Sequence, residues 1–284
     1  MIRQPLTTRA TVAADLTRHC RCCEHCCGVD RLAGERGVCG AGSEARVWRY
    51  WVDHAEEPPL APSLLIYLAG CDLRCAFCIA EANAFDVDRG QLLTPAWLDA
   101  TVAWAVDQGA RTLQWIGGEP TIHLAAVLRV LEYSLPRLPL VWKSNFWGTR
   151  ESWQLLEGII DTYVADFKFG NDRCAAVLAG VERYGEMVRR NLRRVAASQR
   201  LVVRHLLLPG HFDCCFRPIV DWLRRFLPEV PFSLLGGYLP CWRAHRHPEL
   251  SQPLARGVYE RAVELAVGAG LPVYTEGAMR HAYP

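Results

Sequence analysis

The chain has no apolar run long enough to cross a membrane. Its longest runs, such as residues 64–71, fall far short of the roughly 18–20 residues that a span needs. The N-terminal stretch MIRQPLTTRATVAADLTRH lacks the apolar centre of a signal peptide. With 32 basic and 30 acidic residues, the net charge of +2 gives no strong basic footprint of the kind that nucleic-acid-binding proteins show. We therefore expect a cytoplasmic protein with neither a membrane nor a nucleic-acid partner.

Cysteine is the residue that the sequence has in excess. An odd count of 13 argues against a complete set of intramolecular disulfides, and a chain of 284 residues does not need one for stability. Six cysteines fall between Cys20 and Cys39, three fall between Cys71 and Cys78, and only four are scattered beyond them. Clustered cysteines in a cytosolic chain predict metal ligands.

The composition and the hydrophobic pattern of the sequence change near residue 60. Residues 1–60 are rich in cysteine and turns, and they end in AEEPPLAP, whose three prolines indicate a boundary. We predict a small metal-binding segment over 1–60 and a larger domain over 61–284. In the larger part, amphipathic helical stretches separate apolar runs at 64–70, 111–117, 139–145, 161–169, 201–208 and 230–238, with a possible seventh strand at 271–277. This alternation predicts a parallel α/β sheet, and it leaves open whether the sheet forms a barrel or a doubly wound layer.

The most specific motif is GCDLRCAFC, directly after the first apolar run. It places Cys71, Cys75 and Cys78 in C-x3-C-x2-C spacing, with the aromatic Phe77 before the last cysteine. Three thiolates bind three irons of a [4Fe–4S] cube and leave the fourth iron open to a small molecule. A zinc site with a distant fourth ligand is the alternative, and the position at a strand end favours the cluster.

This loop resembles that of the radical S-adenosylmethionine (SAM) superfamily, whose signature is C-x3-C-x-aromatic-C. The segment WIGGEP resembles the superfamily's GGEP motif, which implies that Gly117, Gly118 and Glu119 receive the methionine amino group of SAM. The segments ADFKFGND and VRHLLLPG resemble the D-x-K and V-R elements of activases of glycyl radical enzymes. The resemblance extends the SAM site to Asp166, Lys168 and Arg204.

Within the superfamily, the chain is most similar to the pyruvate formate-lyase-activating-enzyme-like radical SAM proteins. The likeness covers about residues 20–270 and includes CRCCEHCCGVDRLAGERGVCGAG, EEPP, WKSN and RHLLLPGH. It implies a partial (β/α)6 TIM-like barrel that holds a [4Fe–4S] cluster and SAM, with a Cys-rich N-terminal extension. The implied reaction is one-electron reductive cleavage of SAM to methionine and a 5′-deoxyadenosyl radical.

Other polar residues lie at strand ends. Lys143 and Asn145, two apart in WKSN, share a face and are candidates for contact with SAM or substrate, with a structural role as the alternative. Asp166 and Lys168 lie on a buried strand, where charges must be paired or face a cavity. Adjacent strand residues face opposite sides, so we expect Arg204 to point into the barrel.

The N-terminal cysteines form a second metal-site prediction. The pattern of the resembling proteins selects Cys20, Cys23, Cys27 and Cys39, and the additional Cys22 and Cys26 offer an alternative C-x3-C pair. Four thiolates suit either structural zinc or an auxiliary iron–sulfur cluster, and both alternatives stay open. Three further cysteines, in helix-like stretches, are expected to be small buried thiols: Cys174, Cys214 and Cys215.

These observations predict a radical SAM enzyme that works with a one-electron reductant such as flavodoxin or ferredoxin. Activation of a glycyl radical enzyme rests on the family resemblance. Radical modification of a peptide or a small molecule is the first alternative. A non-catalytic iron–sulfur or zinc scaffold is the second, and GGEP argues against it because an electron carrier needs no such site.

Overall fold

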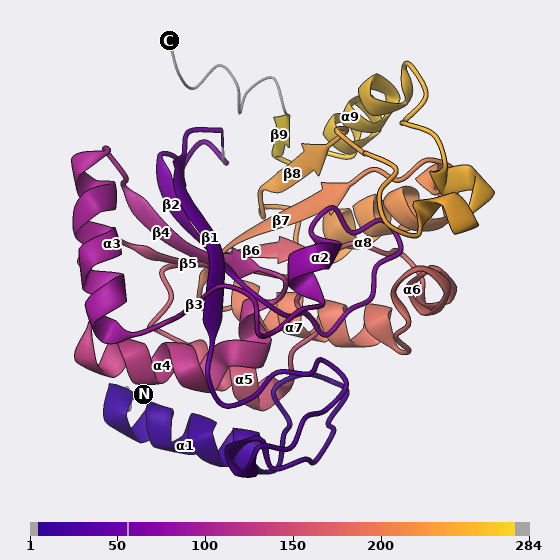
Figure 1. Cartoon of the computed structure of the whole chain (residues 1–284). Coiled ribbons are helices and arrows are strands. Elements are labelled where there is room, and N and C mark those ends of the chain that lie inside the picture. The colour runs from indigo at the N-terminus through magenta and orange to yellow at the C-terminus, as the bar shows by residue number, and fades with distance from the viewer. Residues whose placement is uncertain (1–4, 56, 276–284) are drawn as a thin grey trace.

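The computed structural model describes residues 5–55 and 57–275, which form one nine-stranded sheet with helices around it (Figure 1). The strand order is β3-β1-β2-β4-β5-β6-β7-β8-β9. The strands are β1 (Arg46–Asp53), β2 (Ser63–Leu68), β3 (Gln91–Leu92), β4 (Thr112–Gly117), β5 (Leu140–Ser144), β6 (Thr162–Asp166), β7 (Arg200–Leu206), β8 (Phe232–Leu235) and β9 (Val273–Thr275). The α-helices are α1 (Leu6–Arg18), α2 (Glu81–Ala84), α3 (Pro95–Asp107), α4 (Leu124–Tyr133), α5 (Arg150–Leu156), α6 (Asp172–Ala179), α7 (Tyr184–Ala196), α8 (Arg217–Phe226) and α9 (Val258–Gly268).

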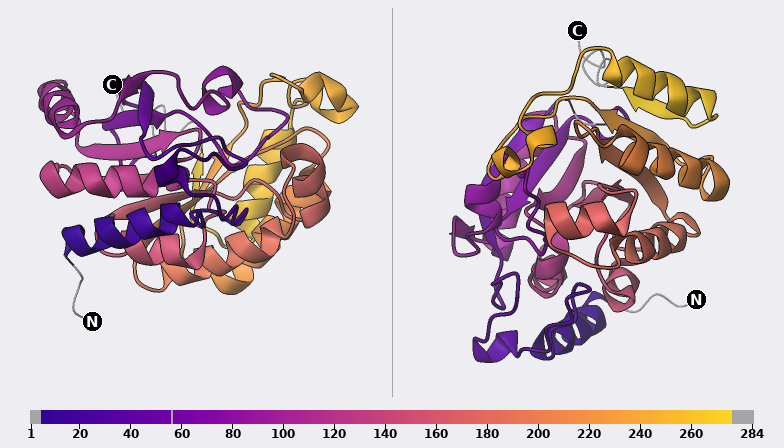
Figure 2. Two further views of the ribbon diagram at one scale, coloured as in Figure 1. Left: turned by 60° about the horizontal axis from the view of Figure 1, so that its bottom comes forward. Right: turned by 90° about the vertical axis from the view of Figure 1, so that its right-hand side faces the viewer.

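The strands from β2 onward, apart from β3, pair in parallel and curve into an open barrel. Helices cover the outer side of this curved sheet, as the right-hand view of Figure 2 shows. Because both faces are covered, strands such as β2 and β5 are almost entirely buried, which explains their continuous apolar runs. The sheet is not closed, because β3 and β9 form its two edges. The predicted partial TIM-like barrel is thereby confirmed.

The expected strands all appear, including the seventh parallel strand at β9, which pairs with β8; residues 276–277 of that prediction lie outside the described residues. Strands β1 and β3 were not predicted from the sequence; β1 pairs antiparallel with β2, and β3 pairs antiparallel with β1 at the edge of the sheet. The strand β1 lies within the first 60 residues, and its partly exposed face made it look like turn-rich surface. Helix α1, also unexpected, packs against α4 and so brings the N-terminal segment onto the barrel (Figure 1).

Helix starts follow from local capping. The hydroxyl of Thr94 accepts the backbone N–H of Trp97 at the start of α3, and the side chain of Asn171 accepts that of Cys174 at the start of α6. Among the described residues, none of the helices is long and apolar enough to cross a membrane. The parallel register brings the carboxyl ends of β2, β4, β5, β6 and β7 to one edge, where polar side chains gather.

Candidate active site

A cavity of about 390 Å³ opens at the carboxyl ends of the parallel strands. This volume falls within the range of about 300–1,000 Å³ that small-molecule sites occupy. The residues predicted for the catalytic cluster and for SAM all line it: Cys71, Cys75, Phe77, Cys78, Gly117, Gly118, Glu119, Lys143, Asn145, Asp166, Lys168 and Arg204. Five different strand ends contribute, so the fold gathers residues that are far apart in the chain.

The three-cysteine loop after β2 is held by backbone hydrogen bonds. The amides of Arg74 and Ala76 donate to carbonyls at the end of α6, over 3.0 and 2.7 Å. Burial raises the pKa of the Cys71 and Cys78 thiols and raises that of Cys75 to about 12, while the nearby Lys168 ammonium opposes the shift at Cys75. Buried thiols of this kind become ligands when a metal centre displaces their protons.

The two glycines of GGEP let two backbones meet. A Cβ on Gly118 would lie 1.8 Å from the carbonyl oxygen of Gly70, and one on Gly117 would lie 2.2 Å from that of Leu68. Gly117 also has a φ of +139°, which side chains rarely adopt. The amides of Gly118 and Glu119 donate to Leu68 and Gly70, each over 2.9 Å. The two glycines therefore bring the end of β4 into close contact with the start of the cysteine loop.

Glu119 is a buried carboxylate with three internal donors. Its Oε1 accepts the Thr121 amide at 2.9 Å and the Ser144 hydroxyl at 2.8 Å, and its Oε2 accepts the Asn145 amide at 2.8 Å. Burial, reinforced by the negative charge of Asp72, raises the pKa of Glu119 to about 7. These bonds fix the carboxylate against the cavity wall, where it changes charge near neutral pH.

Asp166, Lys168 and Arg204 form a charged triad on the neighbouring strands. The Asp166 carboxylate lies 2.8 Å from Lys168 Nζ and 2.5 Å from Arg204 Nε. Burial favours the neutral acid, but the charges of Arg204 and Lys168 outweigh it and hold the pKa of Asp166 well below its usual range. As expected from strand alternation, Arg204 lines the cavity, whereas the buried His205 donates from Nδ1 to the Phe167 carbonyl, 2.7 Å away. The triad offers a net positive, fixed surface to an anionic group.

Lys143 and Asn145 line the cavity, and both have protein partners. Lys143 Nζ lies 3.4 Å from the carboxylate of Glu57, and both side chains are almost fully buried. The side-chain amide of Asn145 donates to Asp72 Oδ1 over 2.7 Å. Within the described part of the chain, the second carboxylate oxygen of Asp72, buried beside the cysteine loop, has no hydrogen-bond partner. Asn145 thus joins the cavity wall formed by Gly117–Glu119, here called the GGEP wall, to the cysteine loop.

The N-terminal cysteines lie next to the active-site loop. Cys20, Cys23 and Cys39 are buried, and Cys27 is half-buried. The ring of His25 contacts the Asp72 carbonyl at 2.9 Å, which joins this segment to the loop that carries Cys71. Among the described residues, no three of these N-terminal cysteines lie close enough together to bind a single metal ion. A group with that spacing lies in another part of the fold.

The two additional N-terminal cysteines differ in their exposure to solvent. Cys22 is buried and Cys26 is exposed. The buried guanidinium of Arg31 lies 3.8 Å from the sulfurs of both Cys20 and Cys22. A hydrogen bond from Cys22, opposed by burial and assisted by the Arg31 charge, lowers the pKa of Cys20 to about 5. The same hydrogen bond, together with burial, raises the pKa of Cys22.

Two carboxylates of the site were not predicted from the sequence. Glu57 lies in the segment that looks like a proline-rich boundary, and Asp72 lies inside the cysteine motif itself. Both are buried. An acidic residue between two clustered cysteines is a usable signal, because such a position is crowded and charges there need partners. For Glu57 the available signal is the EEPP segment that the chain shares with the resembling proteins, because periodicity and composition do not distinguish this glutamate from a surface residue.

Residues 65–223, more than half of the chain, match the model of the Radical SAM superfamily. The chain belongs to the radical SAM superfamily. This radical SAM protein is 31% identical over 267 residues to an uncharacterized protein of Methanocaldococcus jannaschii, with 92% of this chain and 78% of that protein covered.

Solved structures share the fold of this radical SAM protein. The Streptococcus suis protein SuiB bound to the precursor peptide SuiA superposes with a TM-score of 0.53 at 16% identity, over 75% of this chain and 48% of SuiB. A radical SAM methyltransferase from Sphaerobacter thermophilus gives 0.52 at 16% identity, over 76% of this chain and 66% of that one. The chain therefore spans about half the length of SuiB, and at these identities the likeness concerns the fold.

The superfamily uses a [4Fe–4S] cluster and SAM, and the residues of the cavity fit both. Three thiols on one loop suit a cluster with one open iron. The same cavity presents a carboxylate at Glu119 and a cation at Arg204, which match the ammonium and the carboxylate of an amino acid. When bound, the cluster supplies the electron that a sulfonium needs for reductive cleavage.

Proposed function

We propose that this radical SAM protein is an enzyme that reductively cleaves SAM to methionine and a 5′-deoxyadenosyl radical, which abstracts a hydrogen atom from a substrate. One observation carries the proposal. The cysteine loop, the GGEP wall and the Asp166–Lys168–Arg204 triad line the same cavity. An electron carrier or scaffold needs the cysteines and has no use for the other two groups.

In this proposal, Cys71, Cys75 and Cys78 hold the cluster. Glu119 in its ionised form receives the ammonium of SAM, and the backbone at Gly117 and Gly118 fits beneath it. Arg204, oriented by Asp166, receives the carboxylate, while Lys168 adds positive charge beside Cys75. Asn145 positions Glu119 through its backbone amide and the cysteine loop through Asp72, while Lys143 lines the cavity and pairs with Glu57.

The apolar part of the cavity excludes water from the reaction. The ring of Phe77 is buried and makes an edge contact with Phe169, and Leu73 beside it is also buried. A dry wall strengthens the electrostatic contacts to SAM and protects a radical from side reactions. These side chains act by shielding, and no proton transfer is needed from them.

The substrate that we propose is a polypeptide, with the glycine of a glycyl radical enzyme as the first candidate. Two apolar side chains at the cavity, Ile79 and Leu239, are 73% and 58% exposed. Exposed apolar side chains beside a reactive cavity are suited to contact with a partner. The family resemblance supports an activase, and the peptide-bound SuiB supports a peptide substrate.

A deuterium-transfer experiment tests this substrate class. Reduced protein is incubated with SAM and a candidate glycyl radical enzyme made with glycine deuterated at Cα. Deuterium in 5′-deoxyadenosine, together with a glycyl radical signal in the electron paramagnetic resonance spectrum, supports the activase. Deuterium without the stable radical favours peptide modification. SAM cleavage without any transfer from peptides favours a small-molecule substrate.

We also propose that Cys20, Cys23, Cys27 and Cys39 bind a metal centre, either an auxiliary iron–sulfur cluster, whose thiolates bind different irons and lie further apart, or zinc, which would require these sulfurs to move closer together. The contact between His25 and Asp72 brings this segment beside the catalytic loop, which suits a centre that relays electrons from flavodoxin or ferredoxin. Iron analysis distinguishes the alternatives. One [4Fe–4S] cluster gives about four irons per chain, and two give about eight.

A further inference from the structure

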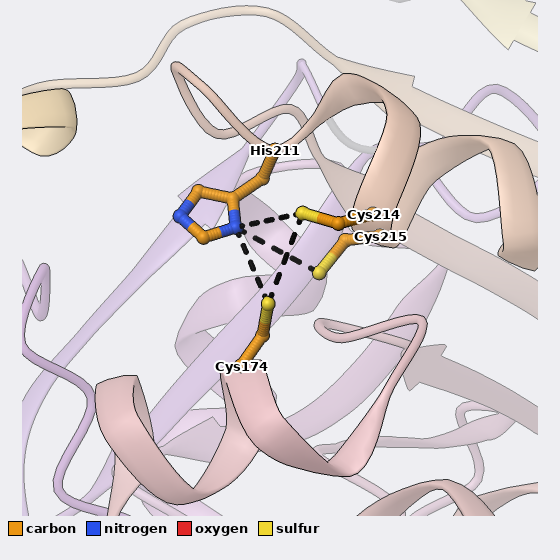
Figure 3. A group of neighbouring side chains, drawn as sticks. All are labelled: Cys174, His211, Cys214 and Cys215. Atoms are coloured by element: carbon orange, nitrogen blue, oxygen red, sulfur yellow. Dashed lines mark hydrogen bonds between the residues drawn. The ribbon is translucent and has the colours of Figure 1, made fainter.

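Four side chains far from the N-terminal cysteines converge at one point: Cys174, His211, Cys214 and Cys215, here called the Cys3His group (Figure 3). Their candidate ligand atoms all lie within 4.8 Å of one another. Nδ1 of His211 lies 3.5 Å from the sulfur of Cys174, 3.3 Å from that of Cys214 and 3.9 Å from that of Cys215. The sulfurs of Cys174 and Cys214 are 3.8 Å apart.

The backbone builds this convergence from two loops. Cys174 lies in the first turn of α6, and Cys214 and Cys215 lie in a single π-helical turn, Phe212–Phe216, before α8. Isolated π turns are frequent at functional sites. A Cβ on Gly170 would lie 2.2 Å from the Cys215 carbonyl oxygen, so glycine lets the two loops touch.

We infer that the Cys3His group binds a zinc ion in a closed, tetrahedral site. With Zn–S of about 2.3 Å and Zn–N of about 2.0–2.1 Å, a tetrahedron separates two sulfurs by about 3.8 Å and a sulfur from a nitrogen by about 3.6 Å. The observed separations of 3.8 Å and 3.3–3.9 Å agree with these edges. An iron–sulfur cube would hold its cysteines further apart, because each sulfur binds a different iron.

Neighbouring groups complete the site as they do around known metals. The side-chain amide of Asn171 points its N–H at the sulfur of Cys174 over 3.2 Å and at that of Cys215 over 3.7 Å, which stabilises thiolates. On the far side of the imidazole, Nε2 of His211 is buried and has no hydrogen bond among the described residues, and the Glu249 carboxylate lies 3.7 Å away. At this distance the carboxylate attracts a metal-bound imidazole electrostatically but does not form the hydrogen bond that would fix its tautomer.

Four protein ligands leave no position for a substrate, so the zinc has a structural role. It ties the loop after β6 to the loop after β7, and these strands carry Asp166 and Arg204 into the cavity. The ion therefore fixes one wall of the proposed SAM site from outside. The inference is independent of the proposed function, because the ion would bind whether or not the chain cleaves SAM. The exposed Cys214 gives zinc access from solvent.

Zinc content tests the inference directly. The full-length protein is purified anaerobically from zinc-supplemented cells, and zinc and iron per chain are measured by mass spectrometry. The double variant Cys174→Ser/Cys214→Ser is expected to carry one zinc fewer than wild type, with unchanged iron. The matched control Cys241→Ser removes a thiol outside the group and is expected to keep all zinc. Equal zinc in all three proteins, or a Cys174–Cys214 disulfide in wild type, would overturn the inference.

A second measurement does not depend on the double variant folding. The wild type and His211→Cys are loaded with cadmium-113 and compared by nuclear magnetic resonance. The wild type is expected to give a resonance of a three-sulfur, one-nitrogen site, and His211→Cys should move that resonance to the position of a four-sulfur site without loss of metal. A spectrum that His211→Cys leaves unchanged would contradict zinc at this position, whatever the N-terminal cysteines bind.

Discussion

Lys143 and Glu57 form an ion pair at the floor of the cavity, with Nζ 3.4 Å from Oε2 and side chains that are 1% and 2% exposed. Removing one partner of a buried pair leaves an uncompensated charge and costs about 3–5 kcal/mol. We therefore expect Glu57→Leu to lower the free energy of unfolding by about that amount, measured by urea denaturation.

The double variant Glu57→Leu/Lys143→Met serves as the control for this pair. Replacing both charges with apolar side chains of similar size is often nearly neutral, so it should restore most of the lost stability. If the double variant is as unstable as Glu57→Leu, then burial of the lysine charge is not the cause.

This pair also shows where the sequence stops being informative. The strand-end motifs could be predicted, because an apolar run followed by a polar residue is a local pattern and parallel strands bring such ends together. The contact between Glu57 and Lys143 joins residues 86 apart, and nothing in a proline-rich segment indicates that its glutamate turns inward. Likewise, helical periodicity placed Cys174 and Cys214 as buried thiols, whereas Cys214 is exposed and both approach His211.

Gly118 is expected to tolerate no side chain. A Cβ there would lie 1.8 Å from the backbone oxygen of Gly70, so Gly118→Ala must displace the start of the cysteine loop. We expect a loss of about 3 kcal/mol in stability and a protein that retains little iron after anaerobic reconstitution. Gly268→Ala is the matched control, since a Cβ in α9 would meet open space, and it should keep both iron and stability. Full iron in Gly118→Ala would refute this account of the motif.

SAM affinity should depend on pH through Glu119. Its pKa is raised from 4.5 to about 7, so the carboxyl is largely protonated at pH 6 and largely ionised at pH 8. Only the ionised form balances an ammonium, and the Kd for SAM should therefore fall by about tenfold between these pH values. Anaerobic equilibrium dialysis measures it.

The variant Glu119→Gln separates this effect from other titrations. It should bind SAM weakly and with no pH dependence over the same range. The free energy of unfolding changes with pH in the opposite direction to SAM affinity. Because the folded-state pKa lies above the ordinary value, the stability contributed by the protonated carboxyl is lost as the pH rises from 4.5 through about 7. A pH dependence that survives in Glu119→Gln would assign it to another group.

The charged triad is expected to contribute to SAM binding through Asp166. In Asp166→Asn, Lys168 and Arg204 lose the carboxylate that orients them at 2.8 and 2.5 Å. Charge-assisted hydrogen bonds contribute about 1.5–3 kcal/mol, so the Kd for SAM should rise about 10–100-fold. Asp88→Asn, which breaks an exposed pair with Arg36, should change nothing. Equal affinity in the two variants would place SAM elsewhere.

The most direct test of reductive SAM cleavage is the formation of 5′-deoxyadenosine. Anaerobically reconstituted protein is given SAM and dithionite, and Cys75→Ala serves as the control because it removes one of the three ligands of the cysteine loop. We predict that the wild type produces 5′-deoxyadenosine and methionine in equal amounts and that Cys75→Ala produces neither. A wild type that holds no cluster, or holds one that is indifferent to SAM, would contradict the account and leave a metal scaffold in its place.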